Sequence, residues 1–276
     1  MSVCDLQVDA LCASLQDSNV LVQRSTLDLL LQVFPIHCCH LTQSNTVTVL
    51  TAAITVVLRR DMSLNRRLYA WLIGTDANGV PFNVIASSAS AATQTGRLER
   101  QDSELPVNME YFNHYSKAFL VQAVKRSLSS DIDEDQKSSL KLRPFKMLMS
   151  LLDKPEIGSA ILEDIFLDVL QCIYCQCVTK ASDHSVRSKM SHSFGPKYDD
   201  STPAVSDVIK TANLLLGSLE PSFIWQFIGQ TLDAACADGS SNQSVPVSDS
   251  VSLLELCTIV DFVLDKLSVV RKIVLF

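Results

Sequence analysis

The cysteine and histidine residues of this chain fall into two groups that could bind a metal ion or react as thiols. The first group is the run HCCH at 37–40, and the second is CIYCQC at 172–177. Consecutive side chains on a helix diverge by about 100°, so four adjacent residues rarely converge on one tetrahedral ion. The C-x-x-C spacing lies within a predicted helix, without the strand and turn that precede redox motifs. We therefore expect packed thiols at both places, and no metal or cofactor.

Three carboxylates, Glu163, Asp164 and Asp168, lie close together on a predicted helix. Asp164 and Asp168 share a face because they are four residues apart. Paired carboxylates perform acid–base catalysis only when burial shifts the pKa of one of them, and a solvated outer face is the commoner arrangement. The sequence contains no nucleophile elbow, P-loop, kinase signature or H-E-x-x-H motif. We therefore expect a protein that is not an enzyme.

The strongest positive signal is a cluster of arginine and aromatic side chains in a chain of net charge −7. The cluster consists of Arg59, Arg60, Arg66, Arg67, Tyr69 and Trp71. Such a patch could bind anionic lipid headgroups, as on a phosphoinositide-containing membrane, or an acidic segment of a partner protein. The alternative is structural: the arginines neutralise helix ends or bridge to acids of a neighbouring repeat, and the two rings pack in the core or line a groove.

The composition excludes several other classes of function. Of the 276 residues, 47% are hydrophobic and 19% charged, with a mean hydropathy of +0.20, which suits stacked helices that bury faces on both sides. The acidic pI of about 5.2 argues against a nucleic-acid partner. Asp5 and Asp9 interrupt the N-terminal stretch where a signal peptide would be apolar, so the nine cysteines are expected to be reduced, cytosolic and mostly buried. The most apolar stretch, 45–58, is too short to span a bilayer.

Helical periodicity recurs along almost the whole chain, and no convincing strand alternation interrupts it. Helices are expected over 3–16, 19–34, 44–60, 63–73, 108–128, 141–152, 155–179, 203–216 and 221–237. Ser63 is expected to cap the fourth helix and Gly74 to close it, and Ser252 with Glu255 fits a capping box that opens a last helix. The polar stretches 75–107 and 180–202 are expected to form long, mobile surface loops.

These helices pair into hairpins, which predicts an all-α fold, an irregular HEAT- or armadillo-like α-solenoid that covers residues 1–276. The segment DSNVLVQRSTLDLLLQVF has the pattern of the second half of a HEAT-type repeat, although the repeat length is irregular. The final residues, SVVRKIVLF, end within an apolar helix that has no cap. A solenoid normally shields its terminal repeat, so we expect the chain to be part of a longer protein.

Five ordered runs of the sequence closely resemble the Dopey family. They are SNVLVQRSTLDLLLQVFP, VVLRRDMSLNRRLYAWLIG, SLLDKPEIGSAILEDIF, IKTANLLLGSLEPSFIWQFI and LCTIVDFVLDKL. The resemblance covers nearly the whole chain apart from the polar stretches, and it places the chain in the N-terminal helical region of that family. The family offers no residue-level motif that can be transferred to this chain.

The resemblance implies a peripheral membrane scaffold without catalytic activity that acts in endosome–Golgi transport. Such a scaffold would lie in the cytoplasm, on Golgi, trans-Golgi network and endosome membranes. The implied partners are a large HEAT-repeat scaffold related to Arf exchange factors, a P-type lipid flippase and a kinesin motor, together with a phosphoinositide-containing membrane surface. A purely structural spacer, recruited to membranes only by its partners, is the alternative.

Overall fold

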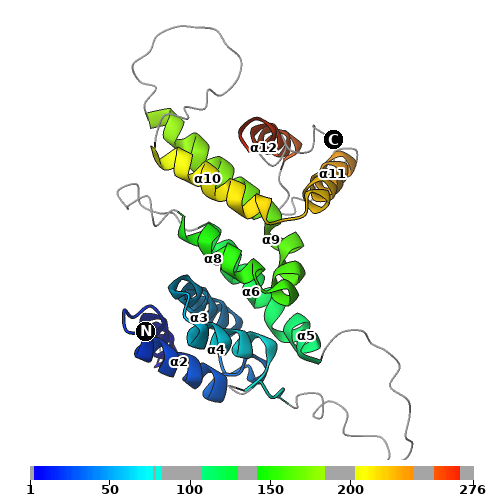
Figure 1. Cartoon of the computed structure of the whole chain (residues 1–276). Helices are drawn as coiled ribbons and strands as arrows, with labels where there is room; N and C mark the ends of the chain where they lie inside the picture. Colours follow the sequence, from blue (N-terminus) through cyan, green and yellow to red (C-terminus); the bar gives the residue numbers. More distant parts are fainter. Residues whose placement is uncertain are drawn as a thin grey trace, which may run out of the picture. The chain divides into compact units, whose positions relative to one another are not determined.

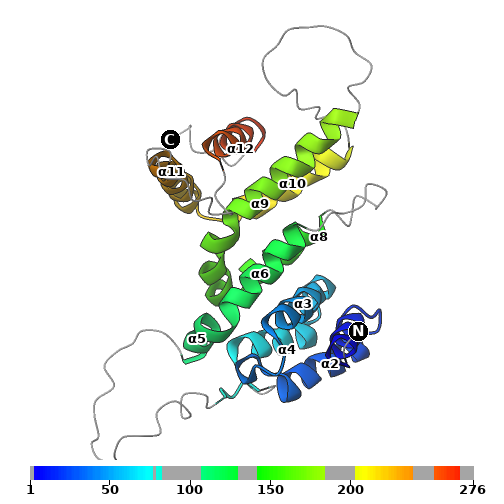
Figure 2. The same ribbon diagram turned by 180° about the vertical axis from the view of Figure 1, so that it is seen from behind.

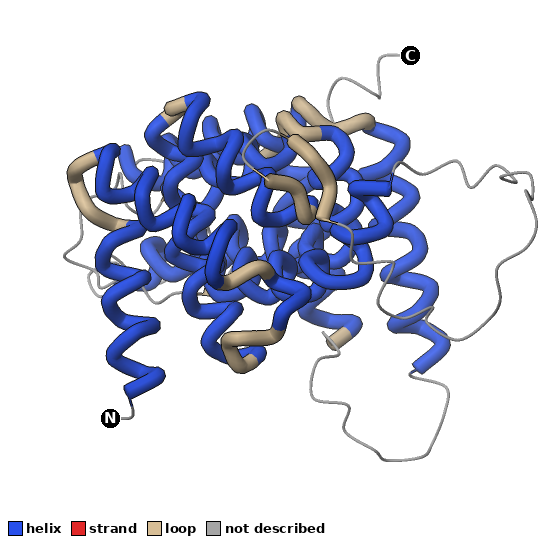
Figure 3. Tube along the Cα trace, turned by 90° about the horizontal axis from the view of Figure 1, so that it is seen from below, coloured by secondary structure: helices blue, strands red, loops and turns tan. Residues whose placement is uncertain are grey.

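The computed structural model describes residues 3–76, 79–82, 107–129, 142–183, 203–238 and 252–267. In these ranges the chain is helical, and Figure 3 shows helices joined by loops with no strand drawn. A single isolated bridge pairs Thr75 with Pro81. The predicted all-α class is confirmed. The chain divides into two compact units, unit 1 (1–127 and 147–164) and unit 2 (128–146 and 165–276).

Three of the first four helices of unit 1 begin at a capping side chain. The four helices are α1 (Val3–Leu15), α2 (Val20–Val33), α3 (Gln43–Ala53) and α4 (Met62–Ile73), which lie together in Figures 1 and 2. Asn19 caps α2 and Thr42 caps α3, each by accepting a backbone N–H of the first turn. The cap of α4 was predicted wrongly. Asp61, not Ser63, accepts the N–H groups of Ser63 and Leu64, so the helix starts one residue earlier.

The helix predicted over 44–60 changes character near its end. After α3 the chain tightens into the 3₁₀ helix η2 (Ile54–Arg59), and Arg60 then adopts a left-handed conformation with φ of 55°. A 3₁₀ turn at a helix terminus satisfies carbonyls that would otherwise lack donors. Gly74, with φ of 70°, closes α4 as predicted. The face of the Tyr111 ring packs on Gly74 so closely that a Cβ there would meet ring atoms at 2.5 Å.

The remaining described part of unit 1 begins with one continuous helical stretch. It consists of α5 (Val107–Tyr111), the π-helical turn η4 (Phe112–Ser116) and α6 (Lys117–Leu128), of which Leu128 belongs to unit 2. The sequence predicted this stretch as a single regular helix, without the π-helical turn. The C-terminal part of α8 (Arg143–Leu152) and the first ten residues of α9 (Pro155–Asp183) complete unit 1. Trp71, Phe112, Leu27 and Leu68 are among its fully buried side chains.

Unit 2 contains the rest of α9, with α10 (Pro203–Gly217), α11 (Pro221–Asp238) and α12 (Leu253–Lys266). The later part of α9 lies beside α10 in both views (Figures 1 and 2). Proline stands at the first position of α9, α10 and α11, where its missing N–H costs nothing. Ser252 caps α12 by accepting the N–H of Glu255, as predicted.

The two predicted polar loops overlap only partly with the described residues. α9 continues to Asp183, so the first four residues of the stretch 180–202 are helical, which corrects that boundary. The parts at 83–106 and 184–202 lie outside the described residues. Among the helices that the structure describes, none combines the length and the apolar character needed to span a membrane.

Candidate docking surface

The arginine and aromatic cluster lies on and just before α4, and the structure divides it into packed and exposed members. Arg67 is a packed, half-buried member: its Nε donates to Asp28 Oδ1 of α2 at 2.6 Å, and its Nη1 donates to Ser63 Oγ at 2.6 Å. Trp71 is 1% exposed, and its Nε1 donates to the carbonyl oxygen of Phe34 at 2.9 Å. Both side chains therefore fix α4 against α2 and its C-terminal end.

Tyr69 is half-buried and has features of both the packed and the exposed members of the cluster. Its hydroxyl donates to the carbonyl oxygen of Ser150 at 3.1 Å, which ties α4 to α8 within unit 1. Burial, together with the negative charge of Asp153, raises the pKa of Tyr69 to about 12, so the phenol stays protonated. The ammonium of Lys154 lies over the ring, 5.4 Å from its centroid. Tyr69 thus joins a structural contact to a half-exposed surface.

The exposed arginines are Arg59, Arg60 and Arg66. The Nη2 of Arg59 donates to the carbonyl oxygen of Asp17 at 2.8 Å, at the entrance of α2. The side chains of Arg60 and Arg66 make no hydrogen bond or ion pair with any residue that the structure describes. Met62 is 87% exposed and lies four residues before Arg66, so the two share one face of α4.

We name this surface the basic ridge: Arg60, Met62, Arg66 and Tyr69, together with Lys154 from the turn between α8 and α9. Met62, Arg66 and Tyr69 follow one face of α4 at spacings of four and three residues. Sequence reasoning missed two members of this ridge. The spacing of Met62 from Arg66 was a usable signal, whereas Lys154 is distant in sequence and no local pattern indicated it. Arg67 and Trp71 have structural contacts, the alternative that the sequence left open.

The HCCH run forms the end of the short helix η1 (Ile36–Cys38) and the loop that follows it. Cys38 and Cys39 are exposed, and the backbone of Cys39 is left-handed with φ of 52°. The expectation of packed, mostly buried thiols was wrong, because most of the described cysteines lie on outer helix faces or in this loop. The Nδ1 of His37 is 3.0 Å from the Tyr111 hydroxyl, and the Nδ1 of His40 is 2.7 Å from the Val33 carbonyl oxygen. Each imidazole therefore already has a partner, and no group of three metal-binding side chains occurs among the described residues.

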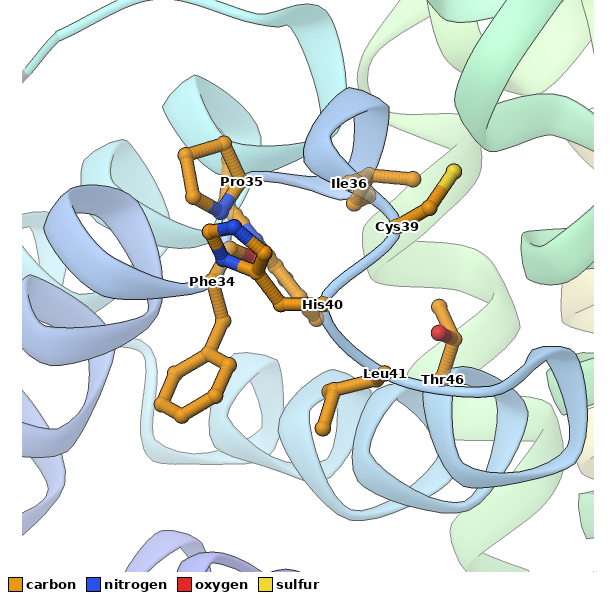
Figure 4. A pocket seen from close by; sticks show the side chains of 8 residues that line it. Phe34, Pro35, Ile36, Cys39, His40, Leu41 and Thr46 are labelled. Carbon is orange, nitrogen blue, oxygen red and sulfur yellow. The ribbon is translucent and has the colours of Figure 1, made fainter.

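A small pocket opens beside this loop, lined by Phe34, Pro35, His40, Leu41 and Trp71 among others (Figure 4). The space open to the centre of a water molecule is about 10 Å³, room for about one water molecule. Ligand pockets of drug size are roughly 300–1,000 Å³. This hollow is therefore a packing gap and not a binding site for a small molecule.

The other candidate groups have structural surroundings. Cys172 and Cys175 are thiols outside any disulfide, and burial raises the pKa of the Cys172 thiol to about 11, which makes it unreactive at neutral pH. Asp164 is 2.9 Å from the ammonium of Lys117, and Glu163 is exposed. The carboxylates of α9 thus include one in a surface ion pair, as expected for a solvated outer face.

Comparison with known proteins gives two family matches in tandem. Residues 2–77 match the model described as Dopey, N-terminal, and residues 111–275 match the model described as DOP1 middle TPR domain. The chain belongs to the Dopey family. TPR and HEAT repeats are both pairs of antiparallel helices that stack into α-solenoids. The Dopey resemblance and the predicted α-solenoid architecture are therefore confirmed.

Relatives in the Dopey family extend from animals to fungi. The chain is 36% identical to the mouse protein DOP1B over 94% of its own length and 11% of that protein. It is 33% identical to DOP1B of Xenopus laevis, over 95% of this chain and 12% of that protein. It is 29% identical to DOP1 of Saccharomyces cerevisiae, over 60% of this chain and 9% of that protein. The chain thus spans about a tenth of the length of these curated relatives. No solved structure matches it.

Proposed function

We propose that this chain is a non-catalytic segment of a peripheral membrane scaffold in endosome–Golgi transport. The observation that carries the proposal is the tandem match to two helical Dopey models over almost the entire chain. Helical-repeat proteins act by presenting extended surfaces to partners, because each repeat adds helix faces that its neighbours do not cover. The segment would therefore work by binding other molecules. It would do so in the cytoplasm, on Golgi, trans-Golgi network and endosome membranes.

The partners of such a scaffold would be a large HEAT-repeat protein related to Arf exchange factors, a P-type lipid flippase and a kinesin motor. Within the described residues, the basic ridge is the surface best suited to docking. It has arginines without carboxylate partners beside an exposed apolar side chain. Cationic surfaces also attract anionic lipids such as phosphoinositides, and this attraction fades within a Debye length of about 8 Å at physiological salt.

A second candidate function is that of a purely structural spacer, and one observation favours it. Arg67, the arginine nearest the centre of α4, bridges to Asp28 of α2 at 2.6 Å instead of facing solvent. In a spacer, the arginines would hold repeats together and membrane recruitment would come entirely from the partners. The two functions differ in what happens when the exposed arginines alone are removed.

Imaging of the fluorescently tagged chain against Golgi and endosome markers tests the proposal. We expect enrichment at trans-Golgi and endosome membranes, and a uniform cytoplasmic distribution would contradict the trafficking role. The double substitution Arg60→Gln with Arg66→Gln leaves the Arg67–Asp28 pair intact. Reduced enrichment of this variant would support a docking role for the ridge, and unchanged enrichment would support the spacer.

A further inference from the structure

The most exposed large apolar side chain among the described residues lies beside cations that have no carboxylate partner. Met62 is 87% exposed at the first turn of α4, with Arg60 before it and Arg66 one turn after it. An isolated exposed apolar residue needs no explanation, because such residues are normal on protein surfaces. Met62 differs because its neighbours on this surface are arginine and tyrosine, and all three residue types are among those enriched in the cores of protein–protein interfaces.

The guanidinium groups of the ridge differ from those of the neighbouring arginines in their contacts. Arg59 and Arg67 already bind Asp17 and Asp28, whereas Arg60, Arg66 and Lys154 have no ion pair with any described residue. An arginine presents a rigid fork of donors that matches a carboxylate in two parallel hydrogen bonds. The ridge thus offers two guanidinium groups and one ammonium group to an external anion.

The backbone at Arg60 has a conformation that is unfavourable for arginine. Its φ of 55° lies in the left-handed region, which glycine adopts freely and most other residues adopt only at an energetic cost. The side chain makes no described contact that would offset this cost. No side-chain hydrogen bond or ion pair among the described residues therefore accounts for an arginine at this corner, and its side chain is exposed.

We propose that the basic ridge is a docking site for an acidic segment of a partner protein that carries at least one large apolar side chain. Carboxylates of the segment would pair with Arg60 and Arg66, and its apolar side chain would cover Met62 and the exposed edge of Tyr69. This assignment rests on the scaffold role proposed above and names the chemistry of one partner.

The acidic residues around the ridge favour a peptide over a membrane as its occupant. Asp153 is exposed beside Lys154, and its charge acts on Tyr69. Asp61 lies between Arg60 and Met62, although its Oδ1 accepts two N–H groups of α4. A continuous anionic surface would meet these carboxylates together with the arginines, whereas a peptide can place its own carboxylates on the arginines alone. Like charges brought together at an interface weaken binding.

Selection from a random twelve-residue peptide library on the immobilised, complete chain tests the proposal. We expect the selected peptides to be rich in Asp and Glu and to contain Leu, Phe or Met. Their affinity should fall as salt is raised. Selected peptides without an excess of acidic residues would overturn the proposal, and so would a failure to select any peptide above background.

Matched variants then locate the site for the strongest selected peptide. Arg60→Gln with Arg66→Gln should lower its affinity about tenfold, since each exposed ion pair contributes up to about 1 kcal/mol. Arg143→Gln with Lys210→Gln removes the same charge from unit 2 and should leave the affinity unchanged. Asp153→Asn should raise it about twofold. Equal losses in the two double variants would show a nonspecific charge effect and overturn the site.

Liposomes that contain phosphatidylinositol 4-phosphate separate the membrane from the peptide. Co-sedimentation that is lost in Arg60→Gln with Arg66→Gln, and that an excess of the selected peptide does not inhibit, would assign the ridge to lipid and overturn the peptide site. A chain that selects acidic peptides but stays uniformly cytoplasmic would contradict only the trafficking role. A chain enriched at trans-Golgi membranes that selects no acidic peptide would contradict only the docking site.

Discussion

The contacts that fix α4 in unit 1 differ in kind from the ring contacts that join α9 to α11 and α12 in unit 2. In unit 1, α4 is fixed by directional bonds, from Arg67 to Asp28, from Trp71 to the Phe34 carbonyl and from Tyr69 to the Ser150 carbonyl. In unit 2, aromatic edges join the helices: Phe166 meets Phe223 and Phe227 at 5.3 and 5.0 Å between centroids, and Tyr174 meets Phe262 at 5.6 Å.

This difference has a consequence for surface chemistry. Directional bonds specify the rotation of α4 about its axis, because each donor must reach one acceptor. The orientation of its outer face, with Met62 and Arg66, is therefore fixed as well. Aromatic packing in unit 2 supplies burial and permits small rotations more readily, since ring pairs tolerate a range of geometries. A docking ridge that needs defined arginine positions is better placed on α4.

The largest expected effect separates packing from hydrogen bonding. Trp71→Ala and Phe166→Ala should each lower the free energy of unfolding by about 3–5 kcal/mol, because both side chains are fully buried. Trp71→Phe keeps a ring in place but leaves the Phe34 carbonyl without its donor, and should cost about 1–3 kcal/mol. Urea unfolding followed by circular dichroism measures all three. A Trp71→Phe variant as stable as the parent would remove the distinction between the units.

A smaller effect distinguishes two neighbouring arginines. Arg67→Gln breaks the half-buried pair with Asp28 and should cost about 1–3 kcal/mol. Arg66→Gln, its matched control on the same helix, should change stability by less than about 0.5 kcal/mol, since Arg66 is exposed and has no described partner. Thermal unfolding of the two variants at equal ionic strength is the measurement. Equal destabilisation would contradict the division of the cluster into structural and free members.

The sequence predicted the local part of this arrangement well. Helix existence and most boundaries follow from capping residues, prolines and apolar periodicity that lie within a few positions of each other, as at Asn19, Pro155 and Ser252. The cap of α4 was predicted two residues too late because both Asp61 and Ser63 are competent N-cap residues. The π-helical turn at 112–116 has no local signature that distinguishes it from an α-helix.

The division of the arginine cluster could not be predicted, because it depends on distant residues. Asp28 is 39 positions from Arg67, and Ser150 is 81 positions from Tyr69. Helical periodicity places Met62, Arg66 and Tyr69 on one face of α4 but does not state which face packs inwards. The sequence therefore predicted a candidate surface around α4, while the choice between free and structural arginines required the tertiary contacts.

Capping residues offer a further comparison between the two units. Asp61→Ala at α4 and Ser252→Ala at α12 should each cost about 1 kcal/mol, since each removes an acceptor for N–H groups of the first turn. Asp61 accepts two such groups and Ser252 one, so the loss at α4 should be the larger. Amide hydrogen exchange at the first turn of each helix checks this ranking. Greater opening of α12 would contradict it.

The smallest expected effect is a pH dependence in unit 1. The Tyr111 hydroxyl accepts the backbone N–H of His37 and is 3.0 Å from its Nδ1, an arrangement that suits a neutral imidazole. Burial, and secondarily the charge of His40, lowers the pKa of His37 from its ordinary value near 6.5. The unfolded chain therefore binds this proton more readily than the folded one. The resulting stability is fully present above pH 6.5 and is lost as the pH falls through the folded pKa.

NMR titration of the His37 ring protons, with unfolding measured from about pH 7 to 5, tests this dependence. His37→Gln, which does not titrate, should show the flatter profile of the two proteins. A His37 pKa above 6.5 in the folded chain would reverse the sign and contradict the expectation.

The left-handed backbone of Arg60 also affects which residue types should be selected at position 60 during evolution. Selection for folding alone would favour glycine there, since glycine adopts a φ of 55° without the clash of a Cβ. Arg60→Gly is thus a substitution that should stabilise the fold and weaken docking at the same time, a conflict between stability and activity. If position 60 is free of functional selection, glycine or asparagine should accumulate there as related chains diverge. Conservation of arginine or lysine at this position in related chains would instead indicate that a partner binds there, and sequence comparison alone would detect it.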